Sequence, residues 1–141
     1  MMQQLIEFIT NHILLFSALV IVLVLIAQNL IAGFGGKQSI APLQATQMIN
    51  REDAVVIDVR PLSDFNNGHI VNAINIPTSA LKNQISQVAK HKEKPIIVAC
   101  RSGAQSSAAC KLLRDAGIER VYNLQGGMLA WQSDSLPISK K

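Results

Sequence analysis

The pattern of hydrophobic and polar positions sets the first part of the chain apart from the rest. Residues 13–27, ILLFSALVIVLVLIA, are apolar except for Ser17, and the apolar run continues past two amides to about Ala32. A helix of about 20 such residues is about 30 Å long, which matches the hydrocarbon core of a bilayer. Ser17 alone does not form the polar face that a helix of a soluble core presents to water. The pattern predicts one transmembrane helix and a membrane anchor formed by residues 1–32.

A cleavable secretory signal is the alternative interpretation of this run. Signals usually carry Lys or Arg before the apolar stretch and small residues at a cleavage site after it. The first twelve residues contain only Glu7 as a charge, and the run ends in AQNLIAGFGG. We therefore expect an uncleaved anchor. Lys37 is the first basic residue of the chain, so the positive-inside rule favours a single-pass membrane protein with a cytoplasmic C-terminal domain.

Beyond the predicted anchor, a Gly-rich linker at 33–39 leads into a domain at 40–138 in which strand and helix patterns alternate. The β-branched runs AVVIDV and PIIVAC are typical of strands buried on both faces of a parallel sheet. Strands are predicted at 54–59, 73–77, 95–100 and 120–124. Helices are predicted from Pro42 to about residue 51, at 80–89 behind a Thr78 or Ser79 cap, from near Ser106 to Gly117, and at 128–132. This alternation predicts an α/β three-layer sandwich around a mostly parallel sheet.

Composition and charge narrow the function classes. The 141 residues are 49% hydrophobic, which is enough for one domain with a core. The net charge of +4 comes from scattered basic residues, and aromatic residues make up 4% of the chain, so we expect no nucleic-acid partner. Two cysteines do not indicate a disulfide scaffold, and no Cys and His spacing suggests a metal site or another cofactor.

The segment VACRSGAQSSAAC places Cys100 at the carboxyl end of a predicted central strand, where sites of α/β sheets gather. A buried spacer, a metal ligand, one half of a disulfide with Cys110 and a nucleophile are the possible roles. The loop residues Arg101, Ser102, Gly103, Ala104 and Gln105 leave backbone N–H groups uncovered before the next helix. Those N–H groups, the helix N-terminus and the Arg101 charge all favour a thiolate. A phosphatase loop requires arginine where this chain has Ser106, so its spacing argues against phosphoryl transfer.

Five motifs in order resemble a single-domain rhodanese over roughly residues 40–135. They are DVR at 58–60, Asp64 and Phe65 before GHI at 68–70, AINIP at 73–77, CRSGAQS at 100–106 and GGMLAW at 126–131. The resemblance implies that Cys100 is the nucleophile of a sulfurtransferase and carries sulfur as a persulfide within a cradle of residues 101–105. It implies a small sulfur donor, which is thiosulfate or a persulfide. It also implies an acceptor such as cyanide or a thiol, and no cofactor.

Gln105 departs from the family pattern, because many active members have a basic residue there. Gln105 donates hydrogen bonds but adds no charge, so thiosulfate and a protein or small-molecule persulfide both remain open as donors. The alternative function is a non-catalytic adapter that uses the rhodanese fold to hold an unidentified protein partner at the membrane.

The remaining marked residues are interpreted as structural. Asp58 and Arg60 are expected to form a buried pair, with Asp64 and His69 supporting the region beside the active loop. Cys110 is expected on the helix flank away from the Ala109 and Leu113 stripe, too far from Cys100 for a disulfide. Trp131 is expected to anchor the core or the rim of a pocket.

Overall fold

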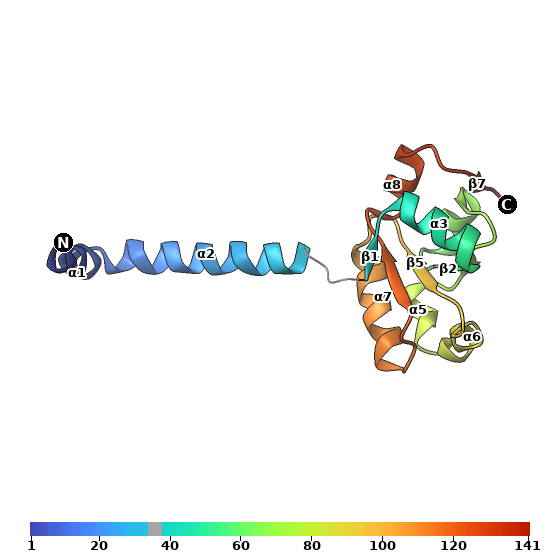
Figure 1. The fold of residues 1–141 in the computed structure, drawn as a ribbon, viewed down its shortest axis with the longest axis horizontal. Coiled ribbons are helices and arrows are strands. Elements are labelled where there is room, and N and C mark those ends of the chain that lie inside the picture. Colours follow the sequence, from blue (N-terminus) through green and yellow to red (C-terminus); the bar gives the residue numbers. More distant parts are fainter. Residues whose placement is uncertain (34–37) are drawn as a thin grey trace. The chain divides into compact units, whose positions relative to one another are not determined.

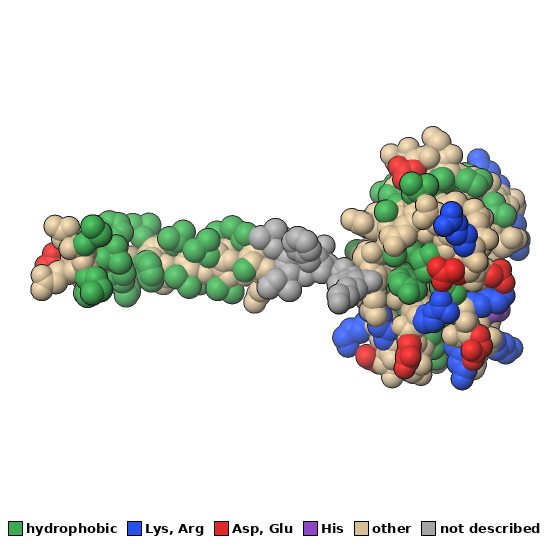
Figure 2. Space-filling view, in the orientation of Figure 1, with side chains coloured by type: hydrophobic (Ala, Val, Ile, Leu, Met, Phe, Trp, Pro, Cys, Tyr) green, Lys and Arg blue, Asp and Glu red, His purple; other side chains and the backbone are tan. Residues whose placement is uncertain are grey.

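A computed structural model describes residues 1–33 and 38–141 of the chain, which divides into the compact units Met1–Lys37 and Gln38–Lys141. The N-terminal unit contains α1 (Met2–Asn11) and α2 (Ile13–Gly33) (Figure 1). Figure 2 shows hydrophobic side chains along the visible face of the described part of this unit. Most of the predicted linker, residues 34–37, lies outside the described residues.

The predicted single transmembrane helix is not supported as such. Within the described residues, no one helix is both long and apolar enough to cross a bilayer. Helix α1 and the segment Ile13–Gln28 meet the length and composition criteria only as a pair, and that pair is bent by 93°. The membrane anchor therefore stays a prediction.

The second unit is built on a parallel sheet with the strand order β1-β6-β5-β2-β4. Its strands are β1 (Ser39–Ile40), β2 (Val55–Asp58), β4 (Ile74–Asn75), β5 (Ile96–Ala99) and β6 (Val121–Leu124). The two longest β-branched runs form the neighbouring strands β2 and β5, and every residue of β5 is buried. The predicted strands and the parallel α/β sheet are confirmed, with strand ends that differ from the prediction by at most two residues.

Helices cover both faces of the sheet and divide the core in two. Helices α5 (Thr78–Leu81), α6 (Ile85–Ala89) and α7 (Ala104–Asp115) pack on one face, with Leu81, Val88 and Leu113 in the core. Helices α3 (Pro42–Glu52) and α8 (Gly127–Ser133) pack on the other face through Ala45 and Trp131. The short helix α4 (Leu62–Asn66) follows β2. Trp131 is a buried core residue, as the sequence suggested, and its Nε1 donates to the Pro137 carbonyl at 3.0 Å.

A second small sheet ties the C-terminus to the middle of the chain. Strand β3 (His69–Ile70) pairs in antiparallel fashion with β7 (Ile138–Ser139), and the Lys141 N–H donates to the Asn66 carbonyl at 3.2 Å. The sequence did not predict β7, because two residues carry no periodicity and their partner lies far away in the chain.

Two helix predictions need correction. The single helix predicted at 80–89 is two short helices. The chain turns after Leu81, because the N–H groups of residues 83 and 84 donate hydrogen bonds to the carbonyls three residues earlier. Neither Thr78 nor Ser79 caps α5 with its side chain. Helix α7 begins at Ala104 rather than near Ser106, because Gly103 adopts the left-handed conformation at its N-cap, with a φ of +96°.

Candidate active site

Cys100 directly follows β5, the middle strand of the sheet. Side chains alternate along a strand, so Ile96, Val98 and Cys100 face α7, whereas Ile97 and Ala99 face α3 and α8. The Cys100 side chain is 1% exposed. The carboxyl end of the strand therefore points the sulfur at the beginning of α7, within the loop that the sequence singled out.

Hydrogen bonds from this loop converge on the Cys100 sulfur. The Gly103 N–H donates to Sγ at 3.0 Å, and the Ser106 hydroxyl lies 3.2 Å from Sγ. Burial raises the pKa of the Cys100 thiol, but the Ser106 hydroxyl and loop N–H groups lower it, and the net pKa lies below its ordinary value. These N–H groups belong to Ser102, Gly103 and Ser106. The arrangement supports a thiolate at Cys100.

The other predicted loop residues have exposed side chains. Ala104 and Gln105 form the first turn of α7, and both are exposed. Arg101, whose charge we expected to favour the thiolate, is also exposed and lines a neighbouring cavity. The described loop therefore acts on the sulfur through its backbone and through Ser106.

Two polar residues beside Cys100, the buried Ser106 and the half-buried Asn123, were missed as site residues by the sequence analysis. Ser106 is 0% exposed, and its Oγ donates to Oδ1 of Asn123 at 2.5 Å. The Asn123 amide in turn donates from Nδ2 to the Gly103 carbonyl at 3.1 Å. The sequence signals were a serine at helical spacing from Ala109 and an asparagine inside an otherwise apolar strand. A polar residue inside a buried strand requires a specific hydrogen-bond partner.

The Gly126–Gly127 turn holds the loop from the other side. The N–H groups of Met128 and Leu129 donate to the Cys100 and Arg101 carbonyls, at 2.8 and 3.1 Å. Gly127 has a φ of +58°, and a Cβ at this position would lie 2.6 Å from the Arg101 carbonyl oxygen and closer still to that of Cys100. Only glycine fits here, because the start of α8 sits directly against the backbone of the loop.

Asp58 and Arg60 form a buried ion pair, as the sequence predicted. Arg60 Nε donates to Oδ1 of Asp58 at 3.0 Å, and Nη2 donates to Oδ2 at 2.7 Å and to the Gly68 carbonyl at 2.8 Å. The side chains of Asp58 and Arg60 are 1% and 8% exposed. The pair therefore links the end of β2 to the turn before β3.

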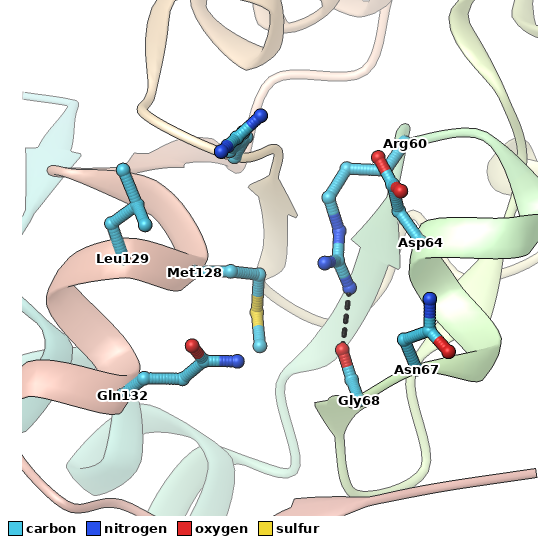
Figure 3. A pocket seen from close by; sticks show the side chains of 8 residues that line it. Arg60, Asp64, Asn67, Gly68, Met128, Leu129 and Gln132 are labelled. Atoms are coloured by element: carbon cyan, nitrogen blue, oxygen red, sulfur yellow. Dashed lines mark hydrogen bonds between the residues drawn. The ribbon is translucent and has the colours of Figure 1, made fainter.

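Arg60 also lines a cavity of about 290 Å³ between α4 and α8 (Figure 3). In the figure, Met128 and Gln132 face Arg60, Asp64 and Asn67 across the opening. The cavity is lined by Arg60, Asp64, Asn67, Gly68, Arg101, Met128, Leu129 and Gln132. Because Asp58 already matches the charge of Arg60, Arg101 and Asp64 supply the remaining opposite charges at this opening, and such a pair suits a small zwitterion.

His69 lies apart from this cavity and has fixed partners. Its Nδ1 lies 2.7 Å from the Phe65 carbonyl, and its ring stacks on the Phe65 ring with centroids 3.7 Å apart. A buried imidazole held in this way braces the turn before β3, in line with the structural interpretation.

The position of Cys110 on α7 differs from the prediction. It lies within the buried face of α7 with Ser106, Ala109 and Leu113, rather than on the flank away from them, and Ala108 is exposed. Both cysteines are free. Within the described residues, no cluster of three His, Cys, Asp or Glu side chains forms a potential metal site.

The burial of Cys110 predicts a pH dependence of stability. Burial raises the pKa of its thiol from 9.0 to about 12. Above its ordinary value the unfolded chain releases a proton that the native chain keeps, so stability falls as pH rises. We expect this thiol to lower the free energy of unfolding by about 1 kcal/mol between about pH 9 and pH 10.

Urea unfolding of the wild type and of Cys110→Ala at both pH values measures this contribution. The variant lacks the buried thiol, so the difference in stability between the two proteins should shrink as pH rises. A difference that stays constant over this range would contradict the raised pKa.

The chain is similar to known proteins in sequence and in fold. A family model described as "Rhodanese-like domain" matches residues 41–134. An "Uncharacterized protein YibN" of Escherichia coli (strain K12) is 35% identical over 139 residues, which is 97% of each chain. "Thiosulfate sulfurtransferase GlpE" of Shewanella oneidensis is 35% identical over 62% of this chain and 85% of its own. The solution structure of the rhodanese-like domain of Anabaena Alr3790 superposes with a TM-score of 0.67 at 29% identity, over 75% of this chain and 81% of its own.

Proposed function

Because the chain belongs to the rhodanese-like family, we propose that it transfers sulfur by way of a persulfide on Cys100. One observation carries this proposal: the Cys100 sulfur accepts a hydrogen bond from the Gly103 N–H at 3.0 Å, and its pKa is lowered. Relatives named as sulfurtransferases support the same class of reaction.

In the proposed reaction, the Cys100 thiolate attacks the outer sulfur of a donor such as thiosulfate. A new S–S bond forms on Cys100 while the S–S bond of thiosulfate breaks, and sulfite leaves with the electron pair. An acceptor such as cyanide then attacks the terminal sulfur, which releases thiocyanate and restores the thiolate. Backbone N–H groups of residues 101–105 are proposed to stabilise the negative terminal sulfur.

The charges around the loop bear on the choice of donor. Arg101 and Arg60 line the cavity between α4 and α8, whereas Gln105 at the start of α7 is exposed and uncharged. Since the charge of Arg60 is matched by Asp58, we propose that Arg101 attracts an anionic or zwitterionic donor, and that thiosulfate is used weakly because position 105 lacks a charge.

Gln105→Lys is therefore expected to raise kcat/KM for thiosulfate by about fivefold, because an exposed charge contributes about 1 kcal/mol. Thiocyanate formation from thiosulfate and cyanide measures the change. Ser107→Lys is the matched control, because it adds the same charge at another exposed position of α7. An equal gain in both variants would point to general attraction by the surface rather than to a contact at position 105.

Mass spectrometry of the full-length protein in detergent tests the proposed function. Trypsin cleaves after Arg101, so Cys100 falls in the peptide 93–101 and Cys110 in the peptide 102–111. Exposure to thiosulfate or to a small-molecule persulfide, followed by alkylation, should add one sulfur atom to the first peptide only. A protein that gains no sulfur from any donor yet keeps its binding partners would be an adapter, and the proposal would be wrong.

We further propose that residues 13–32 anchor the domain to a membrane, with the domain on the cytoplasmic side. The described side chains from Ile13 to Ile26 are uncharged, and the large apolar ones among them are exposed, as in Leu14 and Leu15. Retention of the full chain in membranes after an alkaline wash supports this anchor, and release into the wash contradicts it.

A further inference from the structure

The hydroxyl group of Ser106 has two neighbours that compete for its single proton. The Oγ–Oδ1 distance to Asn123 is 2.5 Å, and the Oγ–Sγ distance to Cys100 is 3.2 Å. A serine hydroxyl donates one hydrogen bond and accepts others, whereas a carbonyl oxygen and a thiolate only accept. Ser106 therefore donates to one neighbour at a time.

The orientation of the Asn123 amide is set by its second bond. Nδ2 donates to the Gly103 carbonyl at 3.1 Å, which turns Oδ1 toward Ser106. Flipping the amide would place two carbonyl oxygens against each other. Oδ1 is consequently a fixed acceptor, and a Ser106 hydroxyl that donates to it can only accept a hydrogen bond from a Cys100 S–H.

The fold brings these groups together through strand register and helix rotation. Asn123 pairs in register with Val98, so both side chains lie on the sheet face toward α7, where Cys100 also points. Ser106 occupies the first buried position of α7, in line with Ala109 and Leu113. The side chains of Cys100, Ser106 and Asn123 therefore meet behind the active loop, with Cys100 and Ser106 buried and Asn123 half-buried.

We propose that Asn123 is a positioning residue that competes with Cys100 for the Ser106 proton and so decides whether Ser106 accepts from the thiol or donates to the thiolate. With the proton on Oδ1, the thiol form is favoured. When the Ser106 hydroxyl donates to Sγ instead, it joins the Gly103 N–H in stabilising the thiolate. The hydrogen bond from Ser106 Oγ to Asn123 Oδ1 is then lost. Forming the thiolate therefore costs the Ser106–Asn123 bond.

Few charged groups surround Cys100 to obscure this effect. Helix α7 contributes Cys110, whose pKa is raised to about 12, and β2 ends in the Asp58–Arg60 pair, in which the charges are matched. Asp58 pairs in register with Ala99, next to Cys100. Helix α8 carries no charged side chain, Tyr122 of β6 packs on the opposite face, and the Arg101 side chain is exposed.

The test is the pH profile of Cys100 alkylation by iodoacetamide in the full chain, followed on the peptide 93–101. Asn123→Ala frees the Ser106 proton and is expected to lower the Cys100 pKa by about half a unit to one unit. Ser106→Ala removes the donor and is expected to raise it. In the double variant the Asn123 substitution should have no further effect, because Asn123 acts through Ser106.

A purely structural role for Asn123 gives the opposite sign. Losing the bond to the Gly103 carbonyl would loosen the loop and raise the Cys100 pKa in both backgrounds, and this result would overturn the proposal. Near-UV circular dichroism checks folding, and Asn123→Leu, which keeps the number and branching of the side-chain heavy atoms, replaces the alanine variant if that variant does not fold. The inference rests on Cys100 as the nucleophile of the proposed function. Alkylation needs no sulfur donor, so a failed sulfur-transfer assay leaves this test intact.

Discussion

Cys100→Ser is expected to abolish sulfur transfer, with a loss of at least about a thousandfold in rate. A serine hydroxyl stays protonated in this pH range and forms no persulfide, so the first step of the proposed reaction cannot occur. The substitution is nearly isosteric, and the Gly103 N–H and Ser106 hydroxyl remain able to bond the new oxygen. The fold should therefore survive while the activity is lost. Thiocyanate formation and the mass of the peptide 93–101 measure the two losses together.

Cys110→Ala is the matched control for this experiment. Cys110 lies in the same core cluster as Cys100, but its pKa of about 12 keeps it protonated and unreactive. The variant should keep the wild-type rate at neutral pH. Residual transfer in Cys100→Ser, or loss of transfer in Cys110→Ala, would place the sulfur-carrying group elsewhere.

Arg60→Ala is expected to destabilise the folded domain by about 3 kcal/mol or more, because it leaves the Asp58 carboxylate buried and without its cation. The side chain of Asp58 is 1% exposed and accepts from both Nε and Nη2 of Arg60. The Gly68 carbonyl loses its donor in the same substitution. One bond remains, since the residue 60 N–H still donates to Oδ1 of Asp58. Urea unfolding followed by tryptophan fluorescence measures the loss.

Lys111→Ala provides the comparison on the surface of the same domain. It breaks an ion pair with Asp115 in which the two side chains are 78% and 67% exposed. Solvent screens this pair, so its loss should change stability by less than about 1 kcal/mol. If Arg60→Ala and Lys111→Ala lose the same free energy of unfolding, burial does not make the Asp58–Arg60 ion pair stronger than an exposed pair.

The strands and the loop after Cys100 were predictable because their signals are local. Two β-branched runs identify β2 and β5, and a cysteine at the end of the second run falls at the carboxyl edge of the sheet. The DVR motif likewise predicts the Asp58–Arg60 pair, since residues two apart at a strand end can contact each other directly. The start of α7 was misplaced by two residues, because a glycine in the left-handed conformation lets the helix begin within the loop.

The partners of the sulfur were not predictable in the same way. Ser106 was considered for its spacing from Cys100 and as the expected start of a helix, and Asn123 was treated as one more residue of a strand. Cys110 was placed on the wrong side of α7, because both a stripe through Ala108 and Leu112 and one through Ser106 and Cys110 have helical spacing. Only the packing of α7 on β5 and β6 selects between these two stripes.

The sequence by itself determined the alternation of strands and helices, the parallel sheet, and the position of Cys100 at its carboxyl edge, because side-chain periodicity and turn chemistry act over a few neighbouring residues. The tertiary structure decided which groups share the environment of the sulfur. The register of β6 against β5 brings Asn123 to the face of Cys100, and the rotation of α7 turns Ser106 between them. Hydrogen bonds require approach to about 3 Å. Residues this far apart in the chain reach such distances only when the whole domain has packed.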